Sequence, residues 1–504
     1  MRKAKQARTK PGPARAERGA PDEVLDLKAA ADFLKVSKPT FYRWLAQGKI
    51  AGSKVGTQWR FRRRDLEGFL QTGAPAGEQV DADELKPVVE KARKTLGLPP
   101  IAWAEPTEDE TAEQSVVRQT ADSIFAGAIE GRASDIHMDV NSDEIVVRFR
   151  VDGVLSEVMT LPRSAHRPLL ARLKLLGDMD IAERRRYQNG RIPLRYQEKE
   201  YDLRVSTFPA VYGESAVIRI LDQMSVLIGM DRLGFLPDLQ QAFERKLREP
   251  SGLIVVTGPA GSGRTTTLYS ALNLLNSPRL KIATIEDPVE YRLRGLMQVH
   301  VNRKAGLTTA VALRGFVRGD PDIILVGDLR DLETAEVCMQ AALTGHLVLT
   351  AMLPPDAPSV ITRLIEMGME PFMVGASLTA VLAQRLVRRV CPSCRVEYRP
   401  SPGVLRSIGM REEEVERATF YRGKGCAACG KWGYKGRTAL FELLEMNDRL
   451  KEMTARRAGT AELRQAAIES GMVTMLQDGL RKASQGLTTI EEVMRVLAVA
   501  HYEG

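Results

Sequence analysis

Apolar and polar positions repeat with several different periods along the chain, and the changes of period divide it into segments. Residues 253–256 form an unbroken apolar run, which is typical of a buried strand, whereas residues 144–153 alternate apolar and polar positions. Helical periodicity covers residues 116–130. The mixed pattern over 113–230 predicts an α+β domain, and the strand–helix alternation over 231–390 predicts an α/β core.

The first part of the chain is predicted to contain a tail, a small folded unit and a linker. Residues 1–20 lack periodicity and are expected to be disordered. Residues 21–71 contain two short amphipathic helices, an alternating hairpin and a closing helix. Residues 72–112 are rich in Pro, Ala, Gly and acidic residues, so we expect a linker with one helix from Asp83 to Thr95.

Composition adds to this outline. A chain of 504 residues with 44% hydrophobic residues can bury several cores. No apolar run approaches the roughly 20 residues of a membrane span, and the basic N-terminus lacks the apolar stretch of a signal peptide. We therefore expect a cytoplasmic protein whose membrane association is peripheral. Residues 1–70 hold 17 Lys and Arg against 7 Asp and Glu, a balance of +10, and residues 71–504 carry −1, which together give the net charge of +9. The positive charge is therefore concentrated at the N-terminal end, which favours an anionic partner there.

A glycine-rich segment joins the apolar run to a helix. Residues 253–267 read LIVVTGPAGSGRTTT, and this order of strand, turn and helix favours a phosphate-binding loop over a chance glycine-rich turn. Backbone N–H groups and a cation would hold the phosphates of a triphosphate, and the Thr265 hydroxyl would bind Mg²⁺. The candidate nucleotide-binding residues are Gly258, Pro259, Ala260, Gly261, Ser262, Gly263, Arg264, Thr265 and Thr266.

Four of the five cysteines form two Cys-x-x-Cys pairs, Cys391/Cys394 and Cys426/Cys429. Two such pairs are the ligand set of a tetrahedral four-thiolate zinc site. A redox pair is the main alternative, but that chemistry needs one pair and not two. Cys338 stands alone in a helical pattern and is expected to be a small buried apolar residue.

The basic unit at residues 21–71, including KVGTQWRFRRRDLEGFL at 54–70, resembles the winged helix-turn-helix of the excisionase and MerR-like families. The resemblance implies DNA binding, with a recognition helix and a wing that meets phosphates. The alternative is a docking module that kept the fold, because basic patches also bind acidic proteins and membranes. The candidate DNA-binding residues are Lys38, Thr40, Tyr42 and Arg43 on the helix, and Lys54, Arg60 and Arg62 on the wing.

From about residue 113 to 445, the order of motifs closely resembles the assembly ATPases of type II secretion and type IV pilus systems. The matching motifs before the core are ASDIH at 133–137, RFRVDG at 148–153, DIAE at 180–183, GRI at 190–192 and DLRVST at 202–207. Those within the core are TIEDPVE at 284–290, DPDIILVGD at 320–328 and LAQRLVRR at 382–389, the last leading into the cysteine region.

The resemblance implies a hexameric ring that binds ATP and Mg²⁺ and works with assembly-platform proteins at the inner face of the bacterial plasma membrane. In such a ring Glu286 would be the general base and Asp328 would hold the Mg²⁺ shell. Four arginines match positions from which guanidinium groups stabilise phosphate charge, and His346 belongs to the family's histidine box. The four arginines are Arg148, Arg191, Arg204 and Arg219.

Three residues depart from the family pattern. Arg264 replaces the loop lysine, Asp328 replaces a glutamate, and Leu353 replaces a second histidine. Arginine keeps the charge but is longer and forked, so it cannot act as a compact point charge. One hypothesis is a slow ATP-hydrolysing motor, and the other is a pseudo-ATPase regulatory subunit that binds nucleotide and DNA.

The predicted fold class is multidomain α/β. A RecA-like phosphate-loop core at 231–390 follows the α+β domain, the winged helix-turn-helix lies at the N-terminus, and a zinc-knuckle region at 391–445 precedes a helical region at 446–504.

Overall fold

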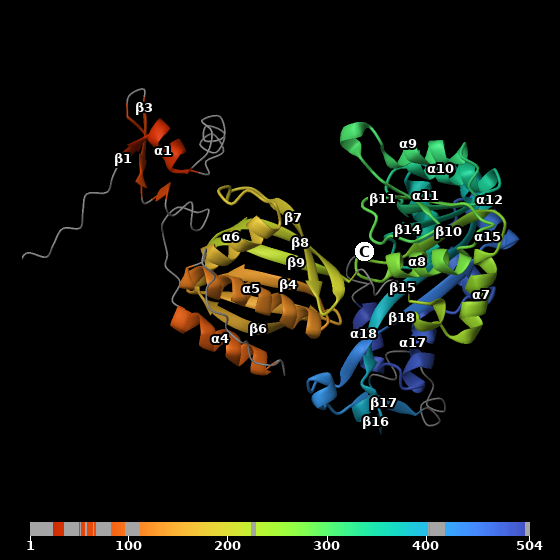
Figure 1. Ribbon diagram of the computed structural model, residues 1–504. Coiled ribbons are helices and arrows are strands. Elements are labelled where there is room, and N and C mark those ends of the chain that lie inside the picture. The colour runs from red at the N-terminus through yellow and green to blue at the C-terminus, as the bar shows by residue number, and fades with distance from the viewer. Residues whose placement is uncertain are drawn as a thin grey trace, which may run out of the picture. The chain divides into compact units, whose positions relative to one another are not determined.

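The computed structural model describes residues 24–34, 50, 52–55, 58–63, 65–66, 82–95, 111–222, 228–401, 403 and 419–498. The chain divides into two compact units (Figure 1). The first unit runs to Ile220, apart from Val151–Val154 and Leu194–Asp202, which group with the second unit. The second unit holds the remainder, from Leu221 to Gly504.

The N-terminal element is a three-stranded antiparallel sheet with one helix, α1 (Leu27–Phe33). The sheet has the order β1 (Val24–Asp26), β3 (Gln58–Arg62), β2 (Ser53–Val55). The Asp26 carboxylate accepts from the Ala29 N–H at 2.8 Å, which satisfies a free donor at the start of α1. A small core holds the element together, and its buried residues are Ala30, Ala31, Leu34, Ile50, Phe61 and Leu66. The hairpin is as predicted, whereas the predicted recognition helix lies outside the described residues.

The main sheet of the first unit has six strands in the order β6-β5-β4-β9-β8-β7. Its strands are β4 (Ala133–Val140), β5 (Glu144–Val151), β6 (Val154–Pro162), β7 (Gln188–Tyr196), β8 (Lys199–Ala210) and β9 (Gly213–Asp222). Ile145, Val147 and Phe149 of β5 are buried, as the alternating pattern predicts. The other face of β5 therefore carries its polar side chains.

Further helices belong to the first unit. α5 (Ala112–Glu130) packs on β4 and beside α6 (His166–Leu176), which follows the short helix η1 (Arg163–Ala165). The helix expected inside the linker is present as α4 (Ala82–Thr95) and packs against α5. Its Arg93 side chain is buried and donates to Ser123 at 3.1 Å. The domain boundaries predicted above remain predictions.

The second unit contains a seven-stranded sheet in the order β12-β11-β13-β14-β10-β15-β18. All strands run parallel except β18, which is antiparallel to β15. The strands are β10 (Gly252–Thr257), β11 (Ile282–Glu286), β12 (Met297–His300), β13 (Ile323–Asp328), β14 (Leu347–Met352), β15 (Leu378–Val390) and β18 (Tyr434–Glu445). This parallel sheet confirms the predicted α/β core.

Helices cover both faces of this sheet, so β10 is buried along its whole length. Ile254 and Val256 pack on the side of α7 (Pro237–Leu247) and α8 (Arg264–Leu275). Leu253 and Val255 pack on the opposite side. The helices on that side are α9 (Thr309–Val317), α10 (Leu332–Leu343), α11 (Ala357–Glu366) and α12 (Pro371–Ser377). Cys338 of α10 is fully buried, as predicted.

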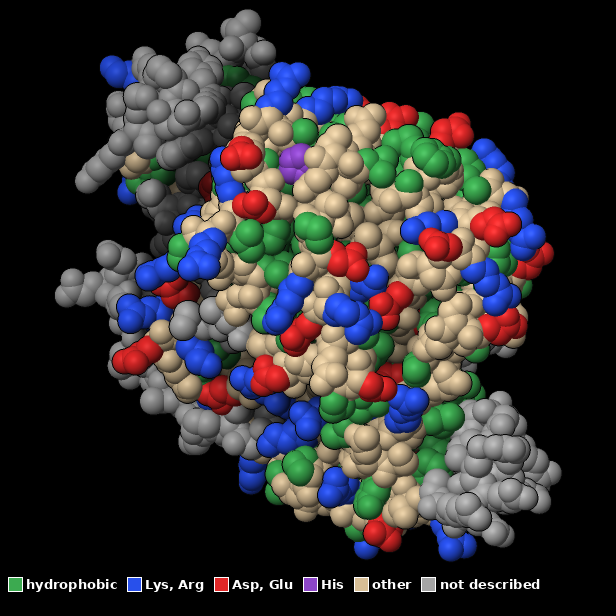
Figure 2. Space-filling model, turned by 90° about the vertical axis from the view of Figure 1, so that its right-hand side faces the viewer, with side chains coloured by type: hydrophobic (Ala, Val, Ile, Leu, Met, Phe, Trp, Pro, Cys, Tyr) green, Lys and Arg blue, Asp and Glu red, His purple; other side chains and the backbone are tan. Residues whose placement is uncertain are grey.

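After β15 come a cysteine region and a helical region. The cysteine region contains η4 (Pro392–Cys394), β16 (Arg395–Tyr398), β17 (Phe420–Gly423) and η5 (Ala427–Cys429). The helices are α15 (Asp448–Ala455), α16 (Thr460–Glu469), α17 (Met475–Ser484) and α18 (Ile490–Ala498). Positive and negative side chains are interspersed over the face of the second unit in Figure 2. Within the described ranges, no helix is both long and apolar enough to cross a membrane.

Candidate nucleotide site and cysteine cluster

The loop between β10 and α8 has the geometry of a phosphate cradle. Gly258, Gly261 and Gly263 have φ angles of +149°, +76° and +91°, which favour glycine. A Cβ atom on Gly258 would lie 2.5 Å from the Gln384 backbone oxygen. No side chain caps the first turn of α8, so its N–H groups face the loop. Pro259 and Ala260 lie in the loop, and Thr265 is exposed at the start of α8, where a cation could reach its hydroxyl.

Gln384 of β15 holds the phosphate loop in place through its side chain. It was not among the predicted site residues. Its side-chain amide donates to the Ser262 backbone oxygen at 2.7 Å and accepts from the Thr267 hydroxyl at 2.8 Å. The side chain is 1% exposed. It therefore ties the loop to the first turns of α8 through a buried polar contact.

Arg264 is the first residue of α8, and its side chain contacts the phosphate loop. Its guanidinium donates to the backbone oxygen of Gly258 and, at 3.0 Å, to that of Met352. It also lies 3.8 Å from Oδ1 of Asp328, whose Oδ2 accepts from Arg330 at 2.6 Å. Burial lowers the pKa of the Arg264 guanidinium. The positive charge at this position is thus held by backbone oxygens and by one carboxylate.

Glu286 at the end of β11 is 5% exposed, and both of its oxygens accept hydrogen bonds. The Tyr269 hydroxyl donates at 2.6 Å and the Thr284 hydroxyl at 2.7 Å. Burial raises the pKa of the Glu286 carboxyl, and the bonds from Tyr269 and Thr284 oppose that rise. Burial also raises the pKa of Tyr269. Tyr269 was not predicted as a site residue, because an aromatic residue in a helical pattern is typical of a core position.

The parallel strands bring these groups to one edge of the sheet. The phosphate loop follows β10, while Glu286 ends β11 and Asp328 ends β13. Because parallel strands end at the same edge, all three lie on the side where α/β proteins bind ligands. The backbone N–H of Gly258 donates to Met352 at the end of β14, which lies between β10 and β13.

His346 lies apart from these residues, and its predicted role toward nucleotide remains a prediction. It precedes β14 at the opposite edge, where its backbone oxygen accepts from Gly252 at 3.0 Å. Six residues of strand separate the two edges by about 20 Å. Its ring Nδ1 lies 2.9 Å from the Ala341 backbone oxygen.

The four predicted arginines lie on the main sheet of the first unit. Each is next to a residue buried against the helices, so each belongs to the opposite, polar face. Arg148 pairs with Asp139, and Arg219 donates to Asp135 at 3.0 Å. The arginines are Arg148 on β5, Arg191 on β7, Arg204 on β8 and Arg219 on β9. Their role toward nucleotide remains a prediction.

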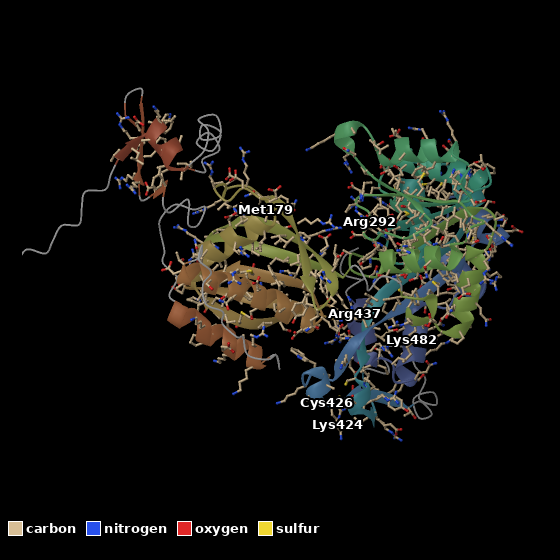
Figure 3. The ribbon with its side chains drawn as sticks, viewed as in Figure 1. Met179, Arg292, Lys424, Cys426, Arg437 and Lys482 are labelled. Atoms are coloured by element: carbon tan, nitrogen blue, oxygen red, sulfur yellow. The ribbon has the colours of Figure 1, made fainter. Side chains whose placement is uncertain are left out.

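The four paired cysteines converge, as predicted, beside η4 and η5 (Cys426 is labelled in Figure 3). Their Sγ atoms all lie within 4.8 Å of one another. Cys391 and Cys426 are 3.9 Å apart, as are Cys394 and Cys429. Four thiolates placed tetrahedrally at about 2.3 Å from zinc are about 3.8 Å apart, so the donor set fits that ion. The N–H of Gly433 donates to Cys429 Sγ at 3.3 Å, which favours a thiolate there.

The predicted DNA-binding residues are only partly described. Arg60 and Arg62 lie on β3, and Arg62 is exposed. Lys54 lies on β2, but its side chain is outside the described part. Lys38, Thr40, Tyr42 and Arg43 also lie outside the described residues.

Comparison with known proteins agrees with this geometry. Residues 109–495 match the family Type II/IV secretion system protein, and residues 24–74 match a helix-turn-helix domain. The type IV pilus assembly ATPase PilB of Thermus thermophilus is 45% identical over 386 residues, which cover 77% of this chain and 43% of the relative. Type II secretion system protein E of Xanthomonas campestris is 45% identical over 392 residues, covering 78% and 69%. The chain thus spans less than half of the Thermus protein and about two thirds of the Xanthomonas one.

Solved structures support the fold. The pilus retraction motor PilT with bound ADP has a TM-score of 0.50 at 24% identity, over 74% of this chain and 95% of that structure. The ATPase DotB of Yersinia pseudotuberculosis has a TM-score of 0.58 at 18% identity, over 79% and 97%. The family match, the extent of the two close relatives and the shared fold show that this chain belongs to the type II/IV secretion system protein family, whose relatives here are type II secretion and type IV pilus assembly ATPases.

Proposed function

We propose that the chain is an ATP-binding and ATP-hydrolysing motor of type II secretion or type IV pilus assembly, working as a homo-hexameric ring with Mg²⁺. The observation that carries the proposal is the convergence of the phosphate loop, Asp328 and Glu286 at one edge of the parallel sheet. A hydrolytic site needs a phosphate cradle, a carboxylate for the cation shell and a group that orients water. These residues supply all three.

Each residue of the edge has a distinct role in this proposal. Backbone N–H groups of the loop and of α8 bind the phosphates, and the Thr265 hydroxyl and Asp328 would hold Mg²⁺, which would neutralise charge on the transferred phosphate. Arg264 adds positive charge beside the phosphates once it leaves its backbone acceptors. Glu286 is the general base, and a raised pKa makes its carboxylate a better proton acceptor.

A second candidate function is a pseudo-ATPase regulatory subunit that binds nucleotide and DNA. The specific observation is that Arg264 donates to the backbone oxygens of Gly258 and Met352 and approaches Asp328, so both charges are satisfied without a ligand. Under this alternative the protein binds nucleotide but does not turn it over. The two candidates differ in the hydrolysis rate of the parent and not in its nucleotide affinity.

The remaining assignments extend the proposal to partners and place. The four cysteines hold a structural Zn²⁺, since their sulfur spacing suits that ion. The ring lies in the cytoplasm and associates peripherally with assembly-platform proteins at the inner face of the plasma membrane. The names of the pilus and secretion relatives support this placement.

The N-terminal helix-turn-helix is proposed to bind DNA, because 17 Lys and Arg lie within residues 1–70. Fluorescence anisotropy with duplex DNA at several salt concentrations tests this role. Replacing Arg43 and Arg60 together by alanine should weaken binding and flatten its salt dependence. Replacing Lys91 and Lys94 of α4 is the matched control. An absence of binding by the parent at low salt would exclude the role.

Nucleotide binding is tested by a glycine pair in the second unit. Gly258→Ala places a Cβ atom 2.5 Å from the Gln384 backbone oxygen and should weaken ATP affinity at least tenfold in calorimetry. Gly306→Ala is the control, since Gly306 also has a positive φ, +75°, but has open space around its Cα. Equal ATP affinity in the parent and both variants would contradict the proposed site.

A further inference from the structure

A cavity of about 180 Å³ lies within the first unit, away from the polar face that carries the four predicted arginines. One wall is the length of α6, and the others are the segment 181–184 and the turn between β8 and β9. Its charged lining residues are Arg163, Arg167, Lys174, Arg184 and Glu214. The DIAE motif at 180–183 borders this cavity, although the proposed function gives it no role.

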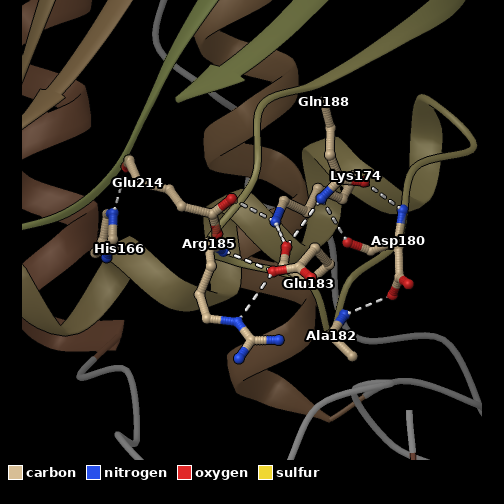
Figure 4. Close-up of polar contacts among 8 residues, drawn as sticks. All are labelled: His166, Lys174, Asp180, Ala182, Glu183, Arg185, Gln188 and Glu214. Carbon is tan, nitrogen blue, oxygen red and sulfur yellow. Dashed lines mark hydrogen bonds and ion pairs between the residues drawn. The ribbon is translucent and has the colours of Figure 1, made fainter. Parts of the chain in front are cut away.

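The floor of the cavity is a buried ion pair (Figure 4). Lys174 is 1% exposed, and its Nζ lies 2.5 Å from Glu214 Oε1 and 2.6 Å from the Glu183 backbone oxygen. A buried charge is stable only when it is paired, so this contact neutralises the one carboxylate that lines the cavity. The three arginines then leave the lining with a net positive charge.

The walls are held in place before any ligand arrives. The His166 ring nitrogen Nε2 lies 2.8 Å from the Glu214 backbone oxygen, and a Cβ on Gly213 would lie 2.6 Å from His166 Cε1. The turn and α6 are therefore in close contact. The side chain of Gln188 accepts from Asp180 N–H at 2.8 Å and donates to Glu183 O at 2.9 Å, which fixes the loop that carries Arg184. Fixed walls reduce the ordering cost of binding.

We propose that this cavity binds a phosphate group, either as free inorganic phosphate or as the phosphate of a nucleotide. Arginine forks match tetrahedral phosphate oxygens bidentately. Arg167 and Arg184 line one small volume above the neutralised floor. Arg163, whose guanidinium donates to the backbone oxygens of Asn141 and Tyr212, adds positive charge to the same lining. Tyr212 is 53% exposed at the rim, where its ring could stack on a nucleotide base. This site is separate from the phosphate loop and does not depend on ATP hydrolysis.

The run Arg184-Arg185-Arg186 offers a matched test, because only Arg184 lines the cavity. The full-length, zinc-loaded protein is titrated calorimetrically with inorganic phosphate and, separately, with AMP. The cavity variant carries Arg167→Ala and Arg184→Ala, and the control carries Arg185→Ala and Arg186→Ala. Phosphate bound at the loop after β10 contributes equally to the titrations of all three proteins. Differences between the titrations therefore measure binding in the cavity.

The parent and the control should show a binding event that weakens at least tenfold in the cavity variant. Phosphate should also raise the thermal unfolding midpoint of the parent and the control more than that of the variant. If the cavity variant loses binding of both inorganic phosphate and AMP, the cavity is a phosphate site. If it loses binding of AMP alone, the cavity is a nucleotide site. If the cavity variant does not fold, Arg184→Gln replaces it. Identical titrations in all proteins, or no saturable binding by the parent, would overturn the proposal.

Discussion

The Tyr269 hydroxyl donates a 2.6 Å hydrogen bond to Oε2 of Glu286, and this bond joins α8, the helix after the phosphate loop, to the end of β11. Tyr269 is 1% exposed and Glu286 5% exposed, so the bond lies in the interior of the second unit. A movement of α8 on nucleotide binding would therefore change the hydrogen bonding, and with it the basicity, of Glu286.

Tyr269→Phe should move the acid limb of the pH–kcat profile to higher pH. Burial raises the pKa of Glu286 and the Tyr269 bond lowers it, so removal of that bond raises the pKa further. Thr284→Val removes a second donor and should shift the limb in the same direction. Steady-state hydrolysis between pH 5 and 9 measures the limb. An unchanged limb in both variants would show that Glu286 is not the titrating base.

Gln384→Leu should loosen the phosphate loop. The variant loses the bonds to Ser262 and Thr267 and leaves those buried groups unpaired, at a cost of about 1–3 kcal/mol. We expect ATP affinity to fall about tenfold for each 1.4 kcal/mol of that cost that appears in binding. Gln240→Leu is the control, because the Gln240 side chain donates to Glu244 within α7 and does not contact the phosphate loop. Calorimetry that finds both variants equal to the parent would refute the role of Gln384.

Zinc content should be about one ion per chain and should be lost in Cys426→Ser, since four thiolates complete a closed tetrahedral site. Cys338→Ala is the control, because Cys338 is buried in α10 outside the cluster. Elemental analysis measures the metal, and chelation should lower the thermal unfolding midpoint of the parent only. A metal-free parent whose cysteines form a reducible disulfide would favour the redox alternative.

Glu492→Gln should destabilise the protein at neutral pH by about 2 kcal/mol, because Glu492 accepts bonds from Arg388 and Arg495. Burial acts to raise the pKa of Glu492, but the bonds from Arg495 and Arg388 outweigh it and lower the pKa to about 2. The folded pKa lies below the ordinary value, so the stabilisation is present above about pH 4.5 and is lost as the pH falls toward 2.

Thermal unfolding of Glu492→Gln and of the parent at pH 7, 5 and 3 measures this dependence. The difference between their midpoints should shrink at pH 3. The exposed Glu336→Gln on α10 is the control and should match the parent throughout. A difference that persists unchanged at pH 3 would contradict the assignment.

The sequence predicted the parts of the fold and site that depend on local patterns. The apolar run at Leu253–Val256 forms the interior strand β10, and each Cys-x-x-Cys pair forms one short turn, at η4 and at η5. The positive φ of Gly263 follows from the glycine spacing itself.

Contacts between distant segments could not be predicted in this way. Gln384 is 122 residues from Ser262, and only the β10–β15 pairing brings them together. The strand β1 was missed because three residues are too few for a periodic pattern.

The most direct test of the account is steady-state ATP hydrolysis by the zinc-loaded protein beside its Glu286→Gln variant, with Glu336→Gln as the control. We expect measurable turnover by the parent and the control, and a kcat about 100-fold or more lower in Glu286→Gln, since general bases contribute on that order. Equal background rates in all three proteins, together with measurable ATP binding, would contradict the motor assignment and identify a regulatory pseudo-ATPase.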